Sequence, residues 1–347
     1  MAQRGTPVTA RRTTMKEVAL KAGVSVFTVS AVVNDSAKVA INTRQSVLEA
    51  MRVLDFEPNH AARSMKLAKS MSVTYVVSDP GQFTDEAVGV NLAGMLEALG
   101  AHGYNLVIES ALKDFSGLKR ALRQGRIDGA ILSAMPPGPA LEELLGWTQP
   151  FVLFDQPSAP PGVPTVFASY RSGIAAAVAH VAARGRKRIA FIGGPPVAQL
   201  NVLHNTERYA GFTEGCRSAG ITADSRLIVN SDFSIQGGRD AMQRLLEKSL
   251  EGTRPDAVVC ATDRLAVGAV HAIQAHGLRV PHDIAVTGFN DSEFAFATDP
   301  MLTTARFPVH EMGFRAAELL IRRIEGTLLS GQERLEIPID LIVRGST

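Results

Sequence analysis

The stretch TTMKEVALKAGVSVFTVSAVVND, residues 13–35, decides the fold of the N-terminal part of this chain. Thr14 followed three residues later by Glu17 is the pattern of a capping box, in which two side chains satisfy free amides at a helix start. Gly23 can take the left-handed conformation that ends a helix, and Ser25 is a second candidate N-cap. The stretch therefore predicts two short helices joined by a turn, which is a helix-turn-helix.

Basic residues are concentrated around this motif. The first 70 residues hold eleven Lys or Arg against five Asp or Glu, an excess of six, whereas the whole chain carries +2 and the remainder therefore −4. A small basic unit joined to a mildly acidic body favours a polyanion as the partner of one end only. A solvated basic face is the alternative interpretation, but the helix-turn-helix favours DNA.

Two further helices are predicted before residue 70. One runs from about residue 42 to residue 54 and is expected to bury Val47, Leu48 and Met51. The other, PNHAARSMKL at residues 58–67, starts with a proline, as helices often do, but has few large apolar side chains. Because isolated helices of this length are marginal in water, we expect it to be ordered only when a partner helix and DNA are both present.

The composition excludes several classes of protein. No apolar run approaches the roughly 18 residues that a membrane span needs, and residues 1–12 lack the apolar segment of a secretory signal. Cys216 and Cys260 are too few and too far apart for a disulfide framework or a zinc site. The sequence holds no Walker A lysine motif, GxSxG or HExxH, and FIGGPP at residues 191–196 is not a GxGxxG loop. We therefore expect a cytoplasmic protein that is not an enzyme and has no metal or cofactor.

From Val73 onward, short apolar runs alternate with helical stretches. Runs such as residues 73–79 and 151–155 end in polar residues, and helical stretches such as residues 86–102 lie between them. Alternation of this kind predicts parallel sheets that helices cover on both faces. About ten such strands exceed one small sheet, so two similar halves are expected, with a ligand cleft beyond the carboxyl ends of the strands.

These motifs together resemble the lactose-repressor (LacI/GalR) family of bacterial transcription regulators. The resemblance covers nearly the whole chain, in the family's order. It rests on the helix-turn-helix stretch and on VLDFEPNHAARSM (53–65), RKRIAFIGGPP (186–196), ERYAGF (207–212), ATDRLAVGAV (261–270), VPHDIAVTGFND (280–291), LTTARFP (302–308) and IVRGST (342–347).

The resemblance implies an all-α helix-turn-helix head, residues 1–57, a hinge helix and linker, residues 58–70, and an α/β body, residues 71–347. The body would have the type I periplasmic-binding-protein fold, with two parallel-sheet subdomains around a ligand cleft. Subdomain N would comprise about 71–168 and 305–334, and subdomain C about 169–304 and 335–347. The chain would cross between them near Ala168, Thr304 and Leu335.

The resemblance also assigns contacts with DNA. Val26, Phe27 and Ala31 would face base edges in the major groove. The family usually has Arg where Ala31 stands, so the common contact of Arg with guanine is missing. Val26 and Phe27 can offer only apolar contact, for which a thymine methyl group is the natural partner. Ser25, Thr28, Ser30 and Asn34 are suited to phosphate contacts that fix register without reading sequence.

The hinge implies a second copy of the chain. Met65 stands where the family inserts a Leu into the minor groove, and Met is an acceptable apolar wedge; an ordinary buried side chain is the alternative. Lys66 would lie in the same groove. Because two hinge helices must meet over one kink, the expected partner is a homodimer on a near-palindromic operator.

The predicted effector site lies in the body. The residues that match the family's effector contacts are Asp155, Arg208, Phe233, Thr262 and Asn290, with Phe233 as the ring that stacks on the ligand. A structural ion pair is the alternative for Asp155 and Arg208, and a place in the core is the alternative for Phe233.

Two of these positions depart from the family's pattern. Sugar-binding members usually carry Asp where Asn290 stands, and many members carry Asn where Thr262 stands. A sugar or sugar derivative remains the leading effector, with a purine or another cyclic metabolite as the alternative. Asp263 and Asp291, which follow these residues, are predicted to be helix N-caps.

The sequence therefore predicts a DNA-binding regulator, a repressor, whose operator affinity a small molecule changes by shifting a conformational equilibrium. One rival is a solute-binding protein for transport, against which the absent signal peptide and the basic head argue. The other is a DNA binder with a degenerate sensor, because of the departures at Ala31, Thr262 and Asn290.

Overall fold

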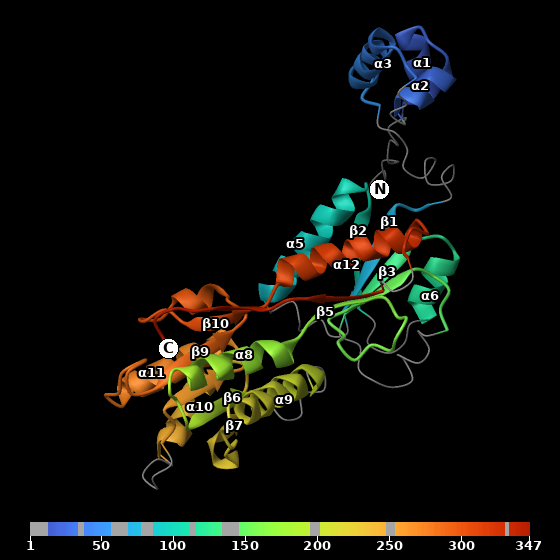
Figure 1. Ribbon diagram of the computed structural model, residues 1–347. Helices are drawn as coiled ribbons and strands as arrows, with labels where there is room; N and C mark the ends of the chain where they lie inside the picture. The colour runs from blue at the N-terminus through green and yellow to red at the C-terminus, as the bar shows by residue number, and fades with distance from the viewer. Residues whose placement is uncertain are drawn as a thin grey trace, which may run out of the picture. The chain divides into compact units, whose positions relative to one another are not determined.

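The computed structural model describes residues 13–33, 38–56, 69–77, 86–110, 116–133, 146–194, 202–247, 254–329 and 333–347 (Figure 1). They belong to two compact units, residues 1–70 and 71–347, which we describe separately as the head and the body. The predicted hinge helix with Met65 and Lys66, and also Asn34, lie outside the described residues. Within those ranges, no helix is long and apolar enough to cross a membrane.

The described part of the head consists of three helices: α1 (Met15–Ala22), α2 (Val26–Val33) and α3 (Ile41–Val53). The predicted capping box is present, because the amide of Thr14 donates to the carboxylate of Glu17 at 2.7 Å and the amide of Glu17 donates to the hydroxyl of Thr14 at 3.4 Å. Gly23 has a φ of 68° and ends α1. These local features confirm the predicted helix-turn-helix.

A small apolar core joins the three helices. Its buried members are Val18, Ala19, Val29, Val32, Val47, Ala50 and Phe56. The prediction that Leu48 is buried is wrong, since half of its side chain is exposed. Successive residues of a helix are about 100° apart, so the stripe that contains Val47 and Ala50 leaves Leu48 beside it.

One half of the body is built on a six-stranded sheet, sheet A, in the order β11-β5-β4-β3-β1-β2, with every neighbouring pair parallel. Its strands are β1 (Ser72–Val77), β2 (Asn105–Ser110), β3 (Gly129–Ser133), β4 (Phe151–Phe154), β5 (Thr165–Ala168) and β11 (Arg334–Ile337). Its helices are α5 (Glu86–Ala101), α6 (Ser116–Arg123) and α12 (Val309–Ile324). Side chains of β1 alternate between two cores: Tyr75 packs in the core with α5 and α12, and Val76 in the core with α6.

The other half is built on sheet B, in the order β12-β10-β9-β8-β6-β7, where only the β10–β12 pair is antiparallel. Its strands are β6 (Ile189–Gly193), β7 (Ile228–Asn230), β8 (Ala257–Cys260), β9 (Ala285–Phe289), β10 (Thr303–Arg306) and β12 (Asp340–Ile342). Its helices are α8 (Tyr170–Ala183), α9 (Val202–Ser218), α10 (Ile235–Glu247) and α11 (Asp263–Ala275). Together the two sheets give the predicted α/β body (Figure 1).

The chain passes between the sheets three times: after β5, between β10 and α12, and between β11 and β12. The last two passages come slightly later than Thr304 and Leu335, where the sequence places them. Thr304 lies inside β10, which pairs with β9. Arg334–Ile337 pairs in parallel with Thr165–Ala168, which keeps this segment in sheet A up to Ile337.

Candidate functional site: helix α2 of the head and an aromatic cluster in the body

Helix α2 presents an apolar face to solvent. Val29 and Val32 are buried in the head core, whereas Val26 is 41% and Phe27 is 83% exposed. The hydroxyl of Ser25 accepts the amide of Thr28 at 3.1 Å, as an N-cap does. None of the eight residues of α2 is charged. An exposed phenylalanine on an uncharged helix is a feature that contact with a partner would explain.

The remaining predicted DNA contacts on α2 are less exposed. Thr28, Ser30 and Ala31 are all of intermediate burial and follow the same helix. Their assignment to phosphates and base edges stays a prediction.

In the body, Asp155 lies directly after β4 and is only 8% exposed, with a left-handed φ of 57°. The hydroxyl of Tyr170, the first residue of α8, donates to Asp155 Oδ2 at 2.8 Å. His204 Nε2, from α9, lies 3.2 Å from the same oxygen and 3.3 Å from the carbonyl oxygen of Asp155. Since β4 belongs to sheet A and α9 packs on sheet B, these contacts join the two halves of the body.

The ring of Tyr170 is the centre of an aromatic cluster that holds Arg208. Ring centroids of His204 and Phe307 lie 4.6 and 4.7 Å from that of Tyr170. The guanidinium of Arg208 lies over Tyr170 at 4.4 Å and 5.7 Å from the ring of Phe233. Such contacts attract a cation to the faces of aromatic rings. Three of the predicted effector residues, Asp155, Arg208 and Phe233, are therefore brought together around Tyr170.

The other two predicted effector residues follow neighbouring strands of sheet B. Thr262 is the N-cap of α11, and its hydroxyl accepts the amide of Leu265 at 3.3 Å. Asn290 follows β9 with a φ of 113°, and its backbone N–H donates to the carbonyl oxygen of Ala305 at 2.9 Å. Because β8 and β9 are parallel neighbours, both residues lie at the carboxyl edge of the sheet, where ligands of such sheets bind.

Comparisons with known proteins agree with this arrangement. The family described as "Bacterial regulatory proteins, lacI family" matches residues 14–59, and "Periplasmic binding protein-like domain" matches residues 178–347. The HTH-type transcriptional regulator CelR of Thermobifida fusca is 32% identical, over 97% of this chain and 98% of its own. The HTH-type transcriptional repressor CytR of Escherichia coli K12 is 31% identical, over 96% of each chain. The chain belongs to the LacI family.

Solved structures of LacI-family proteins share the fold from end to end. The lac repressor dimer bound to operator and the anti-inducer ONPF has a TM-score of 0.79 and 26% identity, over 97% of this chain and 99% of that one. The CelR–cellobiose complex has a TM-score of 0.68 and 30% identity, over 97% and 100%. The predicted helix-turn-helix head and periplasmic-binding-protein-like body are confirmed, and this LacI-family protein is a DNA-binding transcription regulator.

Asp263 and Asp291 have other roles than those predicted. Asp263 is the first residue of α11 rather than its N-cap, because Thr262 has the extended backbone of a cap. Its buried carboxylate accepts from the Thr304 hydroxyl at 2.6 Å and the Ser292 amide at 2.8 Å, and burial raises its pKa to about 6. Asp291 does not cap a helix either; it pairs with Arg306 and Arg344, each at 2.7 Å.

Sequence reasoning missed the residues that connect the predicted ones. His204 precedes Arg208 by four residues on α9, and this spacing places two side chains on one helix face, so the signal was present. Tyr170 carried no such signal, because its contact with Asp155 depends on the passage of the chain from β5 to α8. Tyr75 also lies near this site: burial, with a smaller contribution from the charge of Asp155, raises its pKa to about 12, so its phenol stays protonated at neutral pH.

Metal and thiol chemistry find no support in the described part of the body. It contains no group of three or more His, Cys, Asp or Glu side chains that could hold a metal ion. Cys216 and Cys260 are both buried and free, and burial raises the pKa of each thiol.

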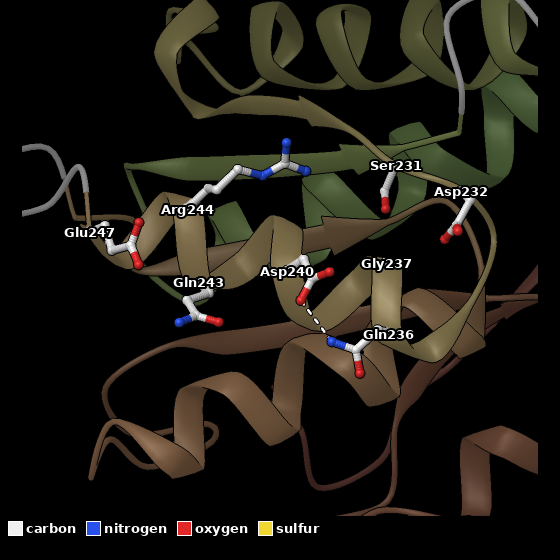
Figure 2. A pocket seen from close by; sticks show the side chains of 8 residues that line it. All are labelled: Ser231, Asp232, Gln236, Gly237, Asp240, Gln243, Arg244 and Glu247. Atoms are coloured by element: carbon white, nitrogen blue, oxygen red, sulfur yellow. Dashed lines mark hydrogen bonds between the residues drawn. The ribbon is translucent and has the colours of Figure 1, made fainter.

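A separate groove lies along α10 (Figure 2). It is open, has a volume of about 540 Å³, and is lined by Ser231, Asp232, Gln236, Gly237, Asp240, Gln243, Arg244 and Glu247. Gln236 donates to Asp240 at 2.8 Å within it. None of the predicted effector residues lines this groove, so it is not the predicted site.

Proposed function

We propose that this protein represses transcription by binding a near-palindromic operator as a homodimer, and that a sugar or sugar derivative bound in the body changes its operator affinity. The observation that carries the proposal is the cluster of buried Asp155 and Arg208 with partly buried Phe233 around Tyr170, at the place where the two halves of the body meet. A chain that matches transcription regulators over nearly its whole length has there the acceptor, the donor and the ring that a sugar needs.

For the head, the proposed base contacts are those of Val26, Phe27 and Ala31, with Ser25, Thr28, Ser30 and Asn34 on phosphates. The exposure of Phe27 supports an apolar contact with a thymine methyl group. Met65 and Lys66 are proposed to enter the minor groove at the centre of the operator.

For the body, the proposed effector contacts are Asp155, Arg208, Phe233, Thr262 and Asn290. A hydroxyl group can donate to Asp155 and accept from Arg208, while the ring of Phe233 covers an apolar sugar face. The CelR structure was determined with cellobiose, which supports the sugar class over a purine.

The dimer is proposed to form through a surface of α5 and β2. Val90 and Leu96 on α5, and Val107 and Ile108 on β2, are each between 40% and 53% exposed. Strand β2 is an edge of sheet A, and exposed apolar edges are normally covered because they otherwise promote aggregation. A second copy of the chain would cover them, as the lac repressor forms a dimer on its operator.

Selection of genomic fragments by the full-length protein, followed by competition with nonspecific DNA, tests the proposal. We expect one site to be preferred by about 10³ or more, and a sugar to change that preference and raise the melting temperature. A solute-binding protein would bind the sugar and no fragment. A DNA binder with a degenerate sensor would bind the site, but no metabolite in the screen would change its melting temperature. A regulator of this kind acts where the chromosome lies, in the cytoplasm, and needs no catalytic step.

A further inference from the structure

The two carboxylate oxygens of Asp155 are not equivalent. Oδ2 accepts a hydrogen bond from the hydroxyl of Tyr170 at 2.8 Å, and Nε2 of His204 lies 3.2 Å from the same oxygen. Oδ1 is buried and has no hydrogen-bond partner among the residues that the structure describes. A buried carboxylate oxygen without a donor is unfavourable, so Oδ1 is the atom of this cluster that is suited to a ligand.

His204 holds more than one atom of Asp155. Its Nε2 also lies 3.3 Å from the carbonyl oxygen of Asp155, whose backbone is in the left-handed region that few residues other than glycine adopt. The imidazole ring is nearly buried and stacks on Tyr170 with centroids 4.6 Å apart. Both the backbone and the carboxylate of Asp155 are therefore fixed from α8 and α9, which lie on the other half of the body.

We propose that His204 and Tyr170 are positioning residues of the effector site, which turn Asp155 so that it meets the effector through Oδ1 alone. The inference rests on the proposed function, since it concerns the same proposed effector site. Rotation of the carboxylate would break the hydrogen bond from Tyr170 to Oδ2 and move Oδ2 away from Nε2 of His204, so the effector cannot engage the two oxygens with a pair of neighbouring hydroxyls. It supplies one donor to Asp155.

Arg208 determines which kind of group the ligand presents at its other end. It lies one helical turn after His204 on α9, and its guanidinium packs on the same Tyr170 ring. Because a guanidinium can only donate, the effector places an acceptor there and a donor at Asp155. A neutral hydroxylated ring meets both demands, whereas a ligand that places a carboxylate or phosphate against Asp155 does not.

Three variants of the full-length protein distinguish hydrogen bonding by Tyr170 and His204 from packing alone. Tyr170→Phe removes the hydroxyl and keeps the ring on which Arg208 packs. His204→Leu removes the donor, and His204→Gln restores an amide donor at a similar reach. His310→Gln on α12 is the control, because this half-exposed histidine faces Glu97 rather than the cluster.

Titration calorimetry with D-ribose, D-glucose and cellobiose is the first measurement. For each sugar that the wild type binds, we expect tenfold or weaker binding by Tyr170→Phe and His204→Leu, binding within about threefold of the wild type by His204→Gln, and no change in the control. Wild-type affinity in both Tyr170→Phe and His204→Leu overturns the proposal. So does an equal loss in His204→Leu and His204→Gln, because that indicates packing alone.

A second measurement needs no sugar. In ¹⁵N-histidine spectra of the wild type, we expect Nε2 of His204 to carry a proton and its resonance to move in an Asp155→Asn variant. If none of the three sugars binds, this spectrum decides, and an unprotonated Nε2 overturns the proposal. Failure of the wild type to select any operator overturns the proposed function instead. The histidine spectrum still tests the contact between His204 and Asp155 in that case.

Discussion

At the scale of single residues, the exposed ring of Phe27 is unfavourable in water unless a partner covers it. An aromatic ring that is 83% exposed contributes little to the head core, and substitution there leaves Val29 and Val32 in place. The side chain is therefore available for DNA, and its removal separates binding from folding.

Phe27→Ala is expected to weaken binding to the selected operator about tenfold, or about 1.4 kcal/mol, with no loss of thermal stability. Fluorescence anisotropy against the operator and a scrambled duplex measures it. Leu20→Ala is the control, because Leu20 is just as exposed but lies on α1. Replacement of operator thymines with uracils should reproduce the loss. Equal weakening on both duplexes would show that Phe27 does not read bases.

Asp263 predicts a pH dependence of stability. Burial raises its pKa from 3.8 to about 6, so between about pH 4 and pH 6 the folded state holds a proton that the unfolded state has released. Stability from this group is therefore fully present below about pH 4 and is lost as the pH rises to about 6, by up to about 3 kcal/mol. The difference in melting temperature between the wild type and Asp263→Asn, measured at pH 4.5 and 6.5, should move in favour of the variant at the higher pH. A constant difference would contradict the shift.

At the scale of elements, α5 and α12 lie side by side (Figure 1) because glycines bring their backbones together. A Cβ atom on Gly94 would lie in contact with the carbonyl oxygen of His310, and one on Gly313 with that of Asn91, both far closer than atoms can approach. The neighbouring atoms are backbone, which cannot move aside unless the helices separate.

Gly94→Ala and Gly313→Ala are each expected to destabilise the body by about 1–3 kcal/mol. Gly100→Ala is the matched control on α5, because a Cβ there meets no atom within 4 Å, and it should stabilise by up to about 1 kcal/mol. Urea unfolding followed by circular dichroism measures all three. If Gly94→Ala matched Gly100→Ala, the close approach of the two helices would be wrong.

Elements were predictable from the sequence where their cause is local. The capping box of Thr14 and Glu17 depends on atoms three residues apart, so its sequence pattern was sufficient. Whether Leu48 is buried depends on which face of α3 meets the other helices. The sequence alone did not show that this face contains Val47 and Ala50 but not Leu48. The place of Arg334–Ile337 in sheet A depends on pairing with a strand about 170 residues earlier, which no local pattern reports.

The candidate site also contains residues that a local motif indicates and contacts that depend on the fold. Asp155 and Arg208 were predictable because each follows or occupies a recognisable motif. The contact between Asp155 and His204 was not, because it joins residues 49 positions apart on different halves of the body. The predicted list therefore named Asp155 and Arg208, which both contact Tyr170, but it did not show which oxygen of Asp155 its neighbours occupy.

At the scale of the whole molecule, the proposed function depends on two heads bound to one operator. Either head alone contacts a half-site, and joining two of them raises affinity by about 10²–10⁴ because the second binding event becomes intramolecular. The apolar surface of α5 and β2 is the proposed connection, so charge placed on it should remove this gain without touching the head.

Leu96→Glu places a carboxylate on α5 at a side chain that is 53% exposed in the single chain, and in a dimer its burial without a partner is costly. We expect the variant to sediment as a monomer at micromolar concentration and to bind the full operator at least a hundredfold more weakly, with half-site affinity unchanged. Leu329→Glu is the control: Leu329 is also exposed, but it precedes β11 at the opposite edge of sheet A from β2. A Leu96→Glu protein that remained dimeric would show that the dimer interface lies elsewhere. A monomer with undiminished operator affinity would refute binding by two heads.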